Sequence, residues 1–493
     1  MQLLKLLTVI GILGLFLTAC QAEVTPAPAP TDLSPQATAT PAPAPTSSAQ
    51  STPAAGQPSP AKPAGSSLGV KPAELRGLKV RFWYAASGEL AKETSALIEA
   101  FNHENIWGIS AEGKAFLSYT ALEEQALAAV KNGDLPQLIA APLEISLSWQ
   151  RKDARASGVT PGPGPELVAL DVYVRDAEWG LSQAEIADFW PSAWQAGQVS
   201  GQRWGIPAEL DAQVLFYNQS WAEQLGFRQP PASSADFRTQ ACAAMKANVA
   251  DDNLENDGTG GWMMSTDAMA LENWRRAFGG EPLPADNGQA YTFNTANSVK
   301  AFSYLRKLLD QNCAWKAKST SPFTYFAQRQ ALFYSGSLSD LAKQQRAMNF
   351  QKSADHWTVL TYPVDQGKPV VLTSGASYSI IKSSPAAQLA TWLLLRSLML
   401  PRAQARLAEA AGLLPARASA LAAMEEYRAG HPQWAQAASW KDYLQSAPQL
   451  GSWRTTRRLL EDAAWQIFQP FTKAEGIGSV LAELDGAAKE LAK

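Results

Sequence analysis

Glu209 and Asp211 are the residues of this chain whose type and spacing best suit chemistry. Residues two apart point to the same face of an extended segment, so both carboxylates would meet one ligand. Such a pair can accept hydrogen bonds from the hydroxyls of a polyol, or act as acid and base in glycoside hydrolysis. Hydrolysis usually needs two carboxyls that flank the scissile bond, roughly 5–10 Å apart. We therefore favour ligand contact, with solvated side chains as the simpler alternative.

Two further segments combine side-chain hydroxyl groups with a glycine, whose backbone N–H and C=O groups are not covered by a side chain. This combination suits hydrogen bonding to a polyol. Tyr334 and Ser335 open a Tyr-Ser-Gly-Ser turn, and Gly375, Ser377 and Tyr378 form a second segment of this kind. Each segment can equally be an ordinary turn, because these residue types are also common in turns. Both segments are predicted to border the same ligand site.

Aromatic rings are the other candidates, because their faces can stack on the C–H surfaces of sugars. The chain has 17 tryptophans, most of which must lie in the core or at its edge. Trp262 follows a glycine-rich loop, and Trp83 stands near the end of the first predicted strand. Trp274 lies within a predicted helix, where a core position is more frequent. Ser87 is placed to cap a helix whose N-terminus can also meet a ligand.

The first folded segment alternates strands and helices. Strands are predicted at 78–84, 108–116 and 138–141, and helices at 88–101 and 122–132, the second ending at Gly133. This β-α-β-α-β order within about sixty residues predicts a parallel sheet. Ligands of such sheets bind beyond the carboxyl ends of the strands, which is where the turn from Trp83 to Gly88 lies.

The rest of the chain is predicted to be mixed and then mostly helical. Further strands are predicted at 214–218, 357–360 and 378–381, and further helices at 236–248, 267–278, 298–311, 322–332 and from 386 onward. No internal repeat is present. The chain is thus predicted to be an α/β protein with enough residues for two domains.

Composition excludes several functions. The charges nearly cancel, with 42 Lys and Arg against 45 Asp and Glu, and no basic run marks a nucleic-acid surface. His103, His356 and His431 are isolated, so no zinc site is predicted. The segment Asn253–Gly258 resembles the start of a calcium loop, but Met264 stands where an EF-hand needs its bidentate acid. No metal or cofactor is therefore predicted.

The N-terminus has the features of an export signal. Lys5 precedes an apolar run from Leu6 to Leu17 that is too short to span a bilayer. The run ends in Leu-Thr-Ala-Cys, which looks like a bacterial lipobox with Cys20 as the lipidated residue. A plain signal peptide with a chance cysteine is the alternative. Residues 1–20 are thus predicted to be a lipoprotein signal that leaves the protein on the extracellular face of the membrane, or in a periplasm.

Residues 21–70 are predicted to be a disordered tether. They consist mostly of Pro, Ala, Ser and Thr, with almost no charge and no aromatic ring. Such a chain reaches between about 40 Å as a coil and about 150 Å as polyproline. A tether of this length lets the domain at 71–493 meet a neighbour on the same membrane while it stays anchored.

The other two cysteines are predicted to form a disulfide. Once Cys20 is lipidated, Cys242 and Cys313 are the only thiols left, and an even pair in an oxidising compartment favours a bridge. Two separate buried thiols are the alternative.

In the order of its pieces, the chain resembles the family 1 extracellular solute-binding proteins, the maltose-binding-like receptors of ABC importers. The resemblance covers roughly residues 75–420, and its pieces keep the spacing of the family. They are 79–88, Phe101-Asn102, 132–136, 205–207, Tyr217-Asn218, 226–231, 375–381 and 412–415. One departure is Ala86, which stands where many relatives have an aromatic residue.

The resemblance implies a type II periplasmic-binding-protein-like fold of two discontinuous lobes that close over a ligand by a hinge. Lobe 1 would comprise about 75–208 and 373–405, and lobe 2 about 212–360 and 406–493. It further implies a monomeric receptor that captures a sugar or oligosaccharide, performs no catalysis and hands the solute to an ABC permease. The alternatives are a lipid-anchored extracellular glycoside hydrolase and a surface carbohydrate-binding protein without a transport role.

Overall fold

The computed structural model describes residues 65–149, 164–284, 286, 288–318, 321–365 and 367–492. Cys20, the signal segment and the tether up to residue 64 lie outside these ranges, so lipid anchoring stays a prediction of the sequence. No helix within the described ranges has both the length and the apolar composition that a bilayer crossing requires. All described residues belong to one compact unit.

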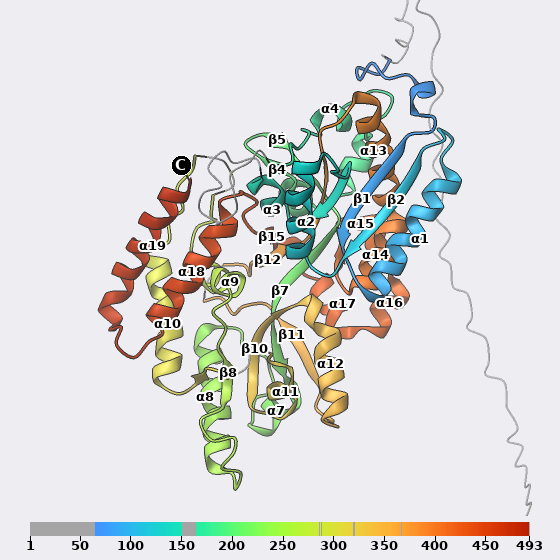
Figure 1. Cartoon of the computed structure of the whole chain (residues 1–493). Coiled ribbons are helices and arrows are strands. Elements are labelled where there is room, and N and C mark those ends of the chain that lie inside the picture. The colour runs from blue at the N-terminus through green and yellow to red at the C-terminus, as the bar shows by residue number, and fades with distance from the viewer. Residues whose placement is uncertain are drawn as a thin grey trace, which may run out of the picture. The chain divides into compact units, whose positions relative to one another are not determined.

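The first sheet has five strands in the order β2, β1, β3, β13 and β6. Their bounds are β1 Lys79–Ala85, β2 Ser110–Phe116, β3 Leu138–Ala141, β6 Ile206–Pro207 and β13 Ser377–Ile380. β1 pairs in parallel with β2 and β3, whereas β13 runs antiparallel to β3 and β6. The helices α1 (Gly88–Glu104) and α2 (Tyr119–Asn132) connect the three parallel strands, as the sequence predicts (Figure 1).

Local sequence explains both connecting helices. The buried face of α1 consists of residues at helical spacing, namely Thr94, Leu97, Ile98 and Phe101. The Asn102 amide then bonds the backbone of Ala111 at 2.6 and 2.9 Å, which fixes α1 against β2. α2 ends at Gly133, whose φ of 66° is the left-handed cap that glycine adopts without strain.

The second sheet is built around the long strand β7 (Glu209–Asn218), in the order β15, β12, β7, β10, β8 and β9. β11 and β14 also pair with β7. The bounds are β8 Gly260–Met263, β9 Ala314–Trp315, β10 Ala331–Ser337, β11 Trp357–Leu360, β12 Val371–Ser374, β14 Leu414–Pro415 and β15 Leu444–Ser446. β10 is antiparallel to β7 and parallel to β8. Gln198–Val199 (β4) and Gln202–Arg203 (β5) form a separate hairpin.

The chain passes between the two sheets at two adjacent points and crosses once more after β13, since β14 and β15 pair within the second sheet. β6 ends at Pro207 in the first sheet and β7 begins at Glu209 in the second, and the chain returns between β12 and β13. The two crossings touch, since the Ala208 N–H donates to the Ala376 carbonyl at 2.9 Å. Gly375 lies between them with φ 154°, where a Cβ would collide with the carbonyl oxygen of Glu209. Only glycine allows this approach.

Helices surround both sheets. In chain order the remaining α-helices are α3 Leu143–Ser148, α4 Asp171–Val174, α5 Gln183–Ala187, α6 Pro191–Ala196, α7 Gln219–Gln224, α8 Ser234–Ala250, α9 Ala268–Ala277, α10 Ala296–Asp310, α11 Phe323–Ala327, α12 Leu341–Phe350, α13 Pro385–Leu398, α14 Pro401–Ala411, α15 Ala418–Ala422, α16 Glu425–Gly430, α17 Pro432–Ala438, α18 Trp453–Ile467 and α19 Ile477–Ala492. We call the body around the first sheet the first lobe and the body around the second sheet the second lobe. α18 and α19 pack with α10 on the second lobe (Figure 1).

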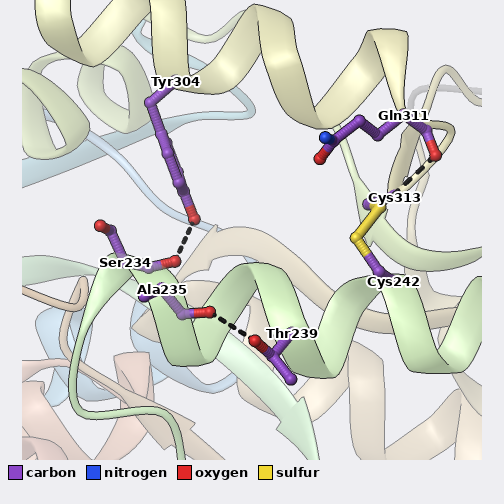
Figure 2. Close-up of a disulfide and its surroundings, with 7 residues drawn as sticks. All are labelled: Ser234, Ala235, Thr239, Cys242, Tyr304, Gln311 and Cys313. Atoms are coloured by element: carbon purple, nitrogen blue, oxygen red, sulfur yellow. Dashed lines mark hydrogen bonds between the residues drawn. A yellow bond between two sulfur atoms is a disulfide. The ribbon is translucent and has the colours of Figure 1, made fainter.

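The predicted disulfide is present within the second lobe. Cys242 of α8 is bonded to Cys313, which directly precedes β9, across a sequence separation of 71 residues (Figure 2). A second tie lies nearby, because the Tyr304 hydroxyl of α10 donates to the Ser234 carbonyl at 2.7 Å. The two contacts fasten α8 to α10 and to the edge of the sheet.

The folded body begins earlier than residue 71. The carboxylate of Asp176 accepts hydrogen bonds from the hydroxyls of Ser66 and Ser67 at 3.1 and 3.0 Å, and from the Ser67 N–H at 2.8 Å. Leu68 and Val70 are partly buried against the core. From its polar composition this stretch is predicted to belong to the tether. Its folding partner, Asp176, lies about a hundred residues away in the sequence, so local composition does not reveal the contact.

Candidate ligand-binding cleft

A cavity of about 640 Å³ opens where the strands of the second sheet end. β8 and β10 are parallel, so their carboxyl ends share one edge of the sheet. The cavity is lined there by residues that follow β8, by the end of β10 and by side chains of α11 and α18. Among these are Met264, Asp267, Phe323, Ser335, Ser337 and Trp465.

Strand register brings Asp211 to this edge. Because β7 is antiparallel to β10, Ser337 at the end of β10 pairs with Gln213 near the start of β7. The Asp211 carboxylate accepts hydrogen bonds from the Ser337 hydroxyl at 2.9 Å and from the Ser339 N–H at 3.2 Å. Burial raises the pKa of Asp211 to about 6, although these hydrogen bonds favour the charged form.

Glu209 faces the first lobe. It lines a second, small cavity of about 30 Å³ together with Tyr119 and Tyr378. Its carboxylate accepts one hydrogen bond, from the Ala376 N–H at 3.3 Å. Burial raises the pKa of Glu209 to about 7, and the negative charge of Asp211 adds to this rise.

Other carboxylates at the large cavity already have partners. Asp267 caps α9 by accepting from the backbone N–H groups of Met269 and Ala270 at 2.9 and 3.2 Å. Asp340 pairs with Lys343 at 3.0 Å. Among the ion pairs of the described residues, none includes Glu209 or Asp211. Glu209 and Asp211 therefore have no protein cation in these ranges to compensate their charge, which a ligand could do.

The structure favours a core role for three of the candidate tryptophans. Trp262 and Trp274 are fully buried and pack edge to face at 5.6 Å in the second lobe. Trp83 is also buried and packs on Phe116 at 5.3 Å. Their rings are not available for stacking on a ligand in the described cavities.

Trp465 is an aromatic side chain that sequence reasoning missed. It is 59% exposed and lines the large cavity from α18. The buried stripe of α18 includes Leu460, Ala464 and Ile467, and Trp465 lies outside it. A large apolar ring on the exposed side of an amphipathic helix was the available signal, because such a residue gains nothing from core packing.

The remaining candidates are placed as follows. Tyr334 is fully buried and stacks on Phe216 at 4.3 Å, whereas its neighbour Ser335 lines the large cavity. Ser377 is buried in β13, and Ser87 is exposed at the start of α1 without a side-chain capping bond. Ser335 thus lines the large cavity, where Asp211 is bonded to Ser337 of the wall, whereas Glu209 and Tyr378 line the small cavity.

An ion pair joins the two lobes. Arg454 of α18 pairs with Glu123 of α2, which is 5% exposed and also accepts from the Trp149 indole at 3.2 Å. The backbones approach closely at the same place, because a Cβ on Gly451 would lie 2.8 Å from the Ser148 nitrogen. The start of α18 therefore rests on the first lobe, although α18 packs within the second.

No metal centre is evident in the described ranges, where no three His, Cys, Asp or Glu side chains are grouped to hold an ion. In the loop that resembles a calcium site, the Asp251 carboxylate accepts from the Asn253 N–H and the Asn256 amide, at 2.8 and 2.9 Å. The loop side chains thus bond one another.

Comparison with known proteins identifies the fold and the family. Residues 96–438 match the family described as bacterial extracellular solute-binding protein. No curated protein sequence matches the chain. Among solved structures, the cyclic α-maltosyl-1,6-maltose binding protein of Arthrobacter globiformis has 14% identity and a TM-score of 0.69, covering 83% of this chain and 98% of its own.

Two further solved structures share the fold. The sugar-binding protein MalE of Xanthomonas citri has 19% identity and a TM-score of 0.68, covering 84% of this chain and 97% of its own. UgpB of Mycobacterium tuberculosis, in complex with glycerophosphocholine, has 16% identity and a TM-score of 0.64, covering 84% and 98%. These similarities establish a two-lobed, mixed α/β fold of the periplasmic-binding-protein type.

Proposed function

Because this chain belongs to the bacterial extracellular solute-binding proteins, we propose that it captures a sugar or oligosaccharide between its lobes and delivers it to an ABC permease. The observation that carries the proposal is an exposed ring, Trp465, that lines the large cavity, together with a carboxylate, Asp211, that is hydrogen-bonded to Ser337 of the cavity wall. A ring face stacks on the C–H face of a pyranose, while the carboxylate accepts bonds from its hydroxyls. The saccharide ligands of the structural neighbours support the same class.

Capture is proposed to be reversible and without chemistry. Glu209 and Asp211 stand two residues apart on one strand, and they line no common cavity. That arrangement suits hydrogen bonding better than the flanking acid and base of a glycosidase. A solute bound with a micromolar Kd would contribute about −8 kcal/mol of binding free energy.

The lipid anchor at Cys20 and the tether are part of this proposal. An anchored monomer with a long tether can load with solute at a distance and still meet the permease on the same membrane. Two sequence features support the anchor and the tether: the lipobox-like Leu-Thr-Ala-Cys and the Pro- and Ala-rich composition of the residues that follow it.

A panel of mono- and oligosaccharides tests the ligand class, with binding measured by calorimetry and thermal shift on the mature chain. We expect at least one saccharide to raise the melting temperature and to be recovered chemically unchanged. If no saccharide binds, the ligand class is wrong. If new reducing ends appear, the protein is a hydrolase and the receptor proposal fails.

Replacing Trp465 with alanine should weaken the best saccharide by about 2 kcal/mol, roughly thirtyfold in Kd, because the stacking surface is lost. Since the ring is mostly exposed, the melting temperature should hardly change. Trp465→Phe should retain most of the affinity, and Phe471→Ala serves as the control, because Phe471 is also exposed but does not line the cavity. Unchanged affinity in Trp465→Ala would place the solute elsewhere.

A further inference from the structure

The small cavity in the first lobe has a composition that neutral polyol recognition does not require. Aromatic rings make up much of its wall, and Glu209 is its one ionisable carboxyl group. The rings of Phe82 and Tyr84 lie 4.8 Å apart, and those of Phe82 and Tyr378 lie 5.9 Å apart. Its volume of about 30 Å³ suits a group of the size of one or two water molecules.

Glu209 is half-buried there and has no cationic partner among the described residues. No lysine or arginine among the described residues lowers its pKa, and its single hydrogen bond comes from the backbone of Ala376. The positive charges of Arg454 and Arg457 instead favour the charged form of Glu144, a buried carboxylate in α3. Partial desolvation of a carboxylate that has no cationic partner is costly, and a cationic ligand group reduces that cost.

Tyr378 offers a ligand a second polar group in this cavity. The residue is 3% exposed and lines the same cavity, and none of the hydrogen bonds between the described residues involves its hydroxyl. The hydroxyl oxygen is not among the fully buried atoms without a partner, so it is accessible to a ligand. Tyr378, Tyr119 and Phe82 also line this cavity, and the electronegative face of an aromatic ring attracts a cation placed over it.

We propose that this cavity binds a protonated amino group of the solute, so that the preferred ligand is an amino sugar rather than a neutral saccharide. The inference rests on the proposed function and narrows its ligand class. The ammonium donates to Glu209 and to the Tyr378 oxygen, while the rest of the sugar extends toward Asp211 and Trp465. A neutral hydroxyl could also bond Glu209, but it would leave the partly desolvated negative charge without a cation. An acetylated amine is both uncharged and too large for the cavity.

The test compares matched ligands by calorimetry on the mature chain at pH 7. Each neutral sugar is paired with its 2-amino-2-deoxy and 6-amino-6-deoxy analogues and with their N-acetylated forms. We expect an amino member to bind at least thirtyfold tighter than its neutral and acetylated partners. If neutral sugars bind as tightly as the amines, or more tightly, the inference is wrong while the proposed function stands. If no member of any kind binds, both fail.

Glu209→Gln removes the charge and keeps the shape of the side chain. In this variant we expect the preference for the amine to fall below threefold, while neutral sugars lose much less affinity. Glu178→Gln is the control, because Glu178 is exposed and does not line the cavity. This variant should prefer the amine over the neutral sugar as strongly as the unchanged protein does. An undiminished preference in Glu209→Gln overturns the assignment.

A second readout needs no variant. The pKa of Glu209 lies near 7 when the cavity lacks a cation, so the carboxyl group is partly protonated at pH 7. Because a bound ammonium favours the charged carboxylate, Glu209 must release a fraction of a proton when the ligand binds. Calorimetry in two buffers of different ionisation enthalpy measures this release, with a 6-amino analogue whose amine stays protonated. Binding without proton release would contradict the contact with Glu209.

Discussion

Replacing Cys242 and Cys313 together with serine should lower the free energy of unfolding by about 4 kcal/mol. The bridge closes a loop of 71 residues, and in the chain-entropy model a loop of that length restricts the unfolded chain by this amount. Urea unfolding, followed by tryptophan fluorescence, measures the loss. Many of the 17 tryptophans lie in the core, so the signal is large.

The natural control for this variant is the unchanged protein in the presence of a reductant, which should show the same lower midpoint. Cys313 directly precedes β9, which pairs with β8, and the residues that follow β8 line the large cavity. We therefore also expect weaker saccharide binding once the bridge is absent. An unaltered urea midpoint in the double variant would show that the bridge contributes little.

Replacing Arg454 with methionine should lower the free energy of unfolding by about 3 kcal/mol. The substitution keeps much of the side-chain volume but leaves the buried carboxylate of Glu123 with only the Trp149 indole. Removal of one partner from a buried ion pair typically costs about 3–5 kcal/mol, and the partial exposure of Arg454 places this pair at the low end. Urea unfolding again measures the change.

Arg402→Met is the matched control, because Arg402 pairs with Glu104 on the surface, where such a pair contributes about 0–1 kcal/mol. The Arg454 pair joins the two lobes, so its loss should also shift the protein toward an open arrangement and weaken solute binding. Equal effects of the two variants would mean that the contact between α18 and the first lobe is energetically unimportant.

The sequence predicted the parts of the fold that depend on local patterns. The first three strands and two helices follow from alternating and helical spacing of apolar residues, and Gly133 marks the end of α2 as a left-handed glycine should. The disulfide followed from the count of thiols and the predicted compartment. The two carboxylates on β7 could be singled out because extended residues two apart share a face.

Features that depend on distant contacts were not predictable in this way. The role of Ser66 and Ser67 depends on Asp176, and the setting of Asp211 depends on the register of β10, more than a hundred residues away. The spacing of apolar residues in α18 places Trp465 outside the buried stripe, but it does not show that Trp465 lines a cavity or that Trp262 fills the core. Which residues line the cavity is decided by how the second sheet and α18 meet, and no local pattern carries that information.

A crystal structure of the mature chain with the tightest ligand of the sugar panel tests the central claim most directly. The account predicts one solute that lies against Trp465 and Asp211 of the second lobe and reaches Glu209 and Tyr378 on the first-lobe side. A solute bound outside these cavities, or held by one lobe alone, would contradict it.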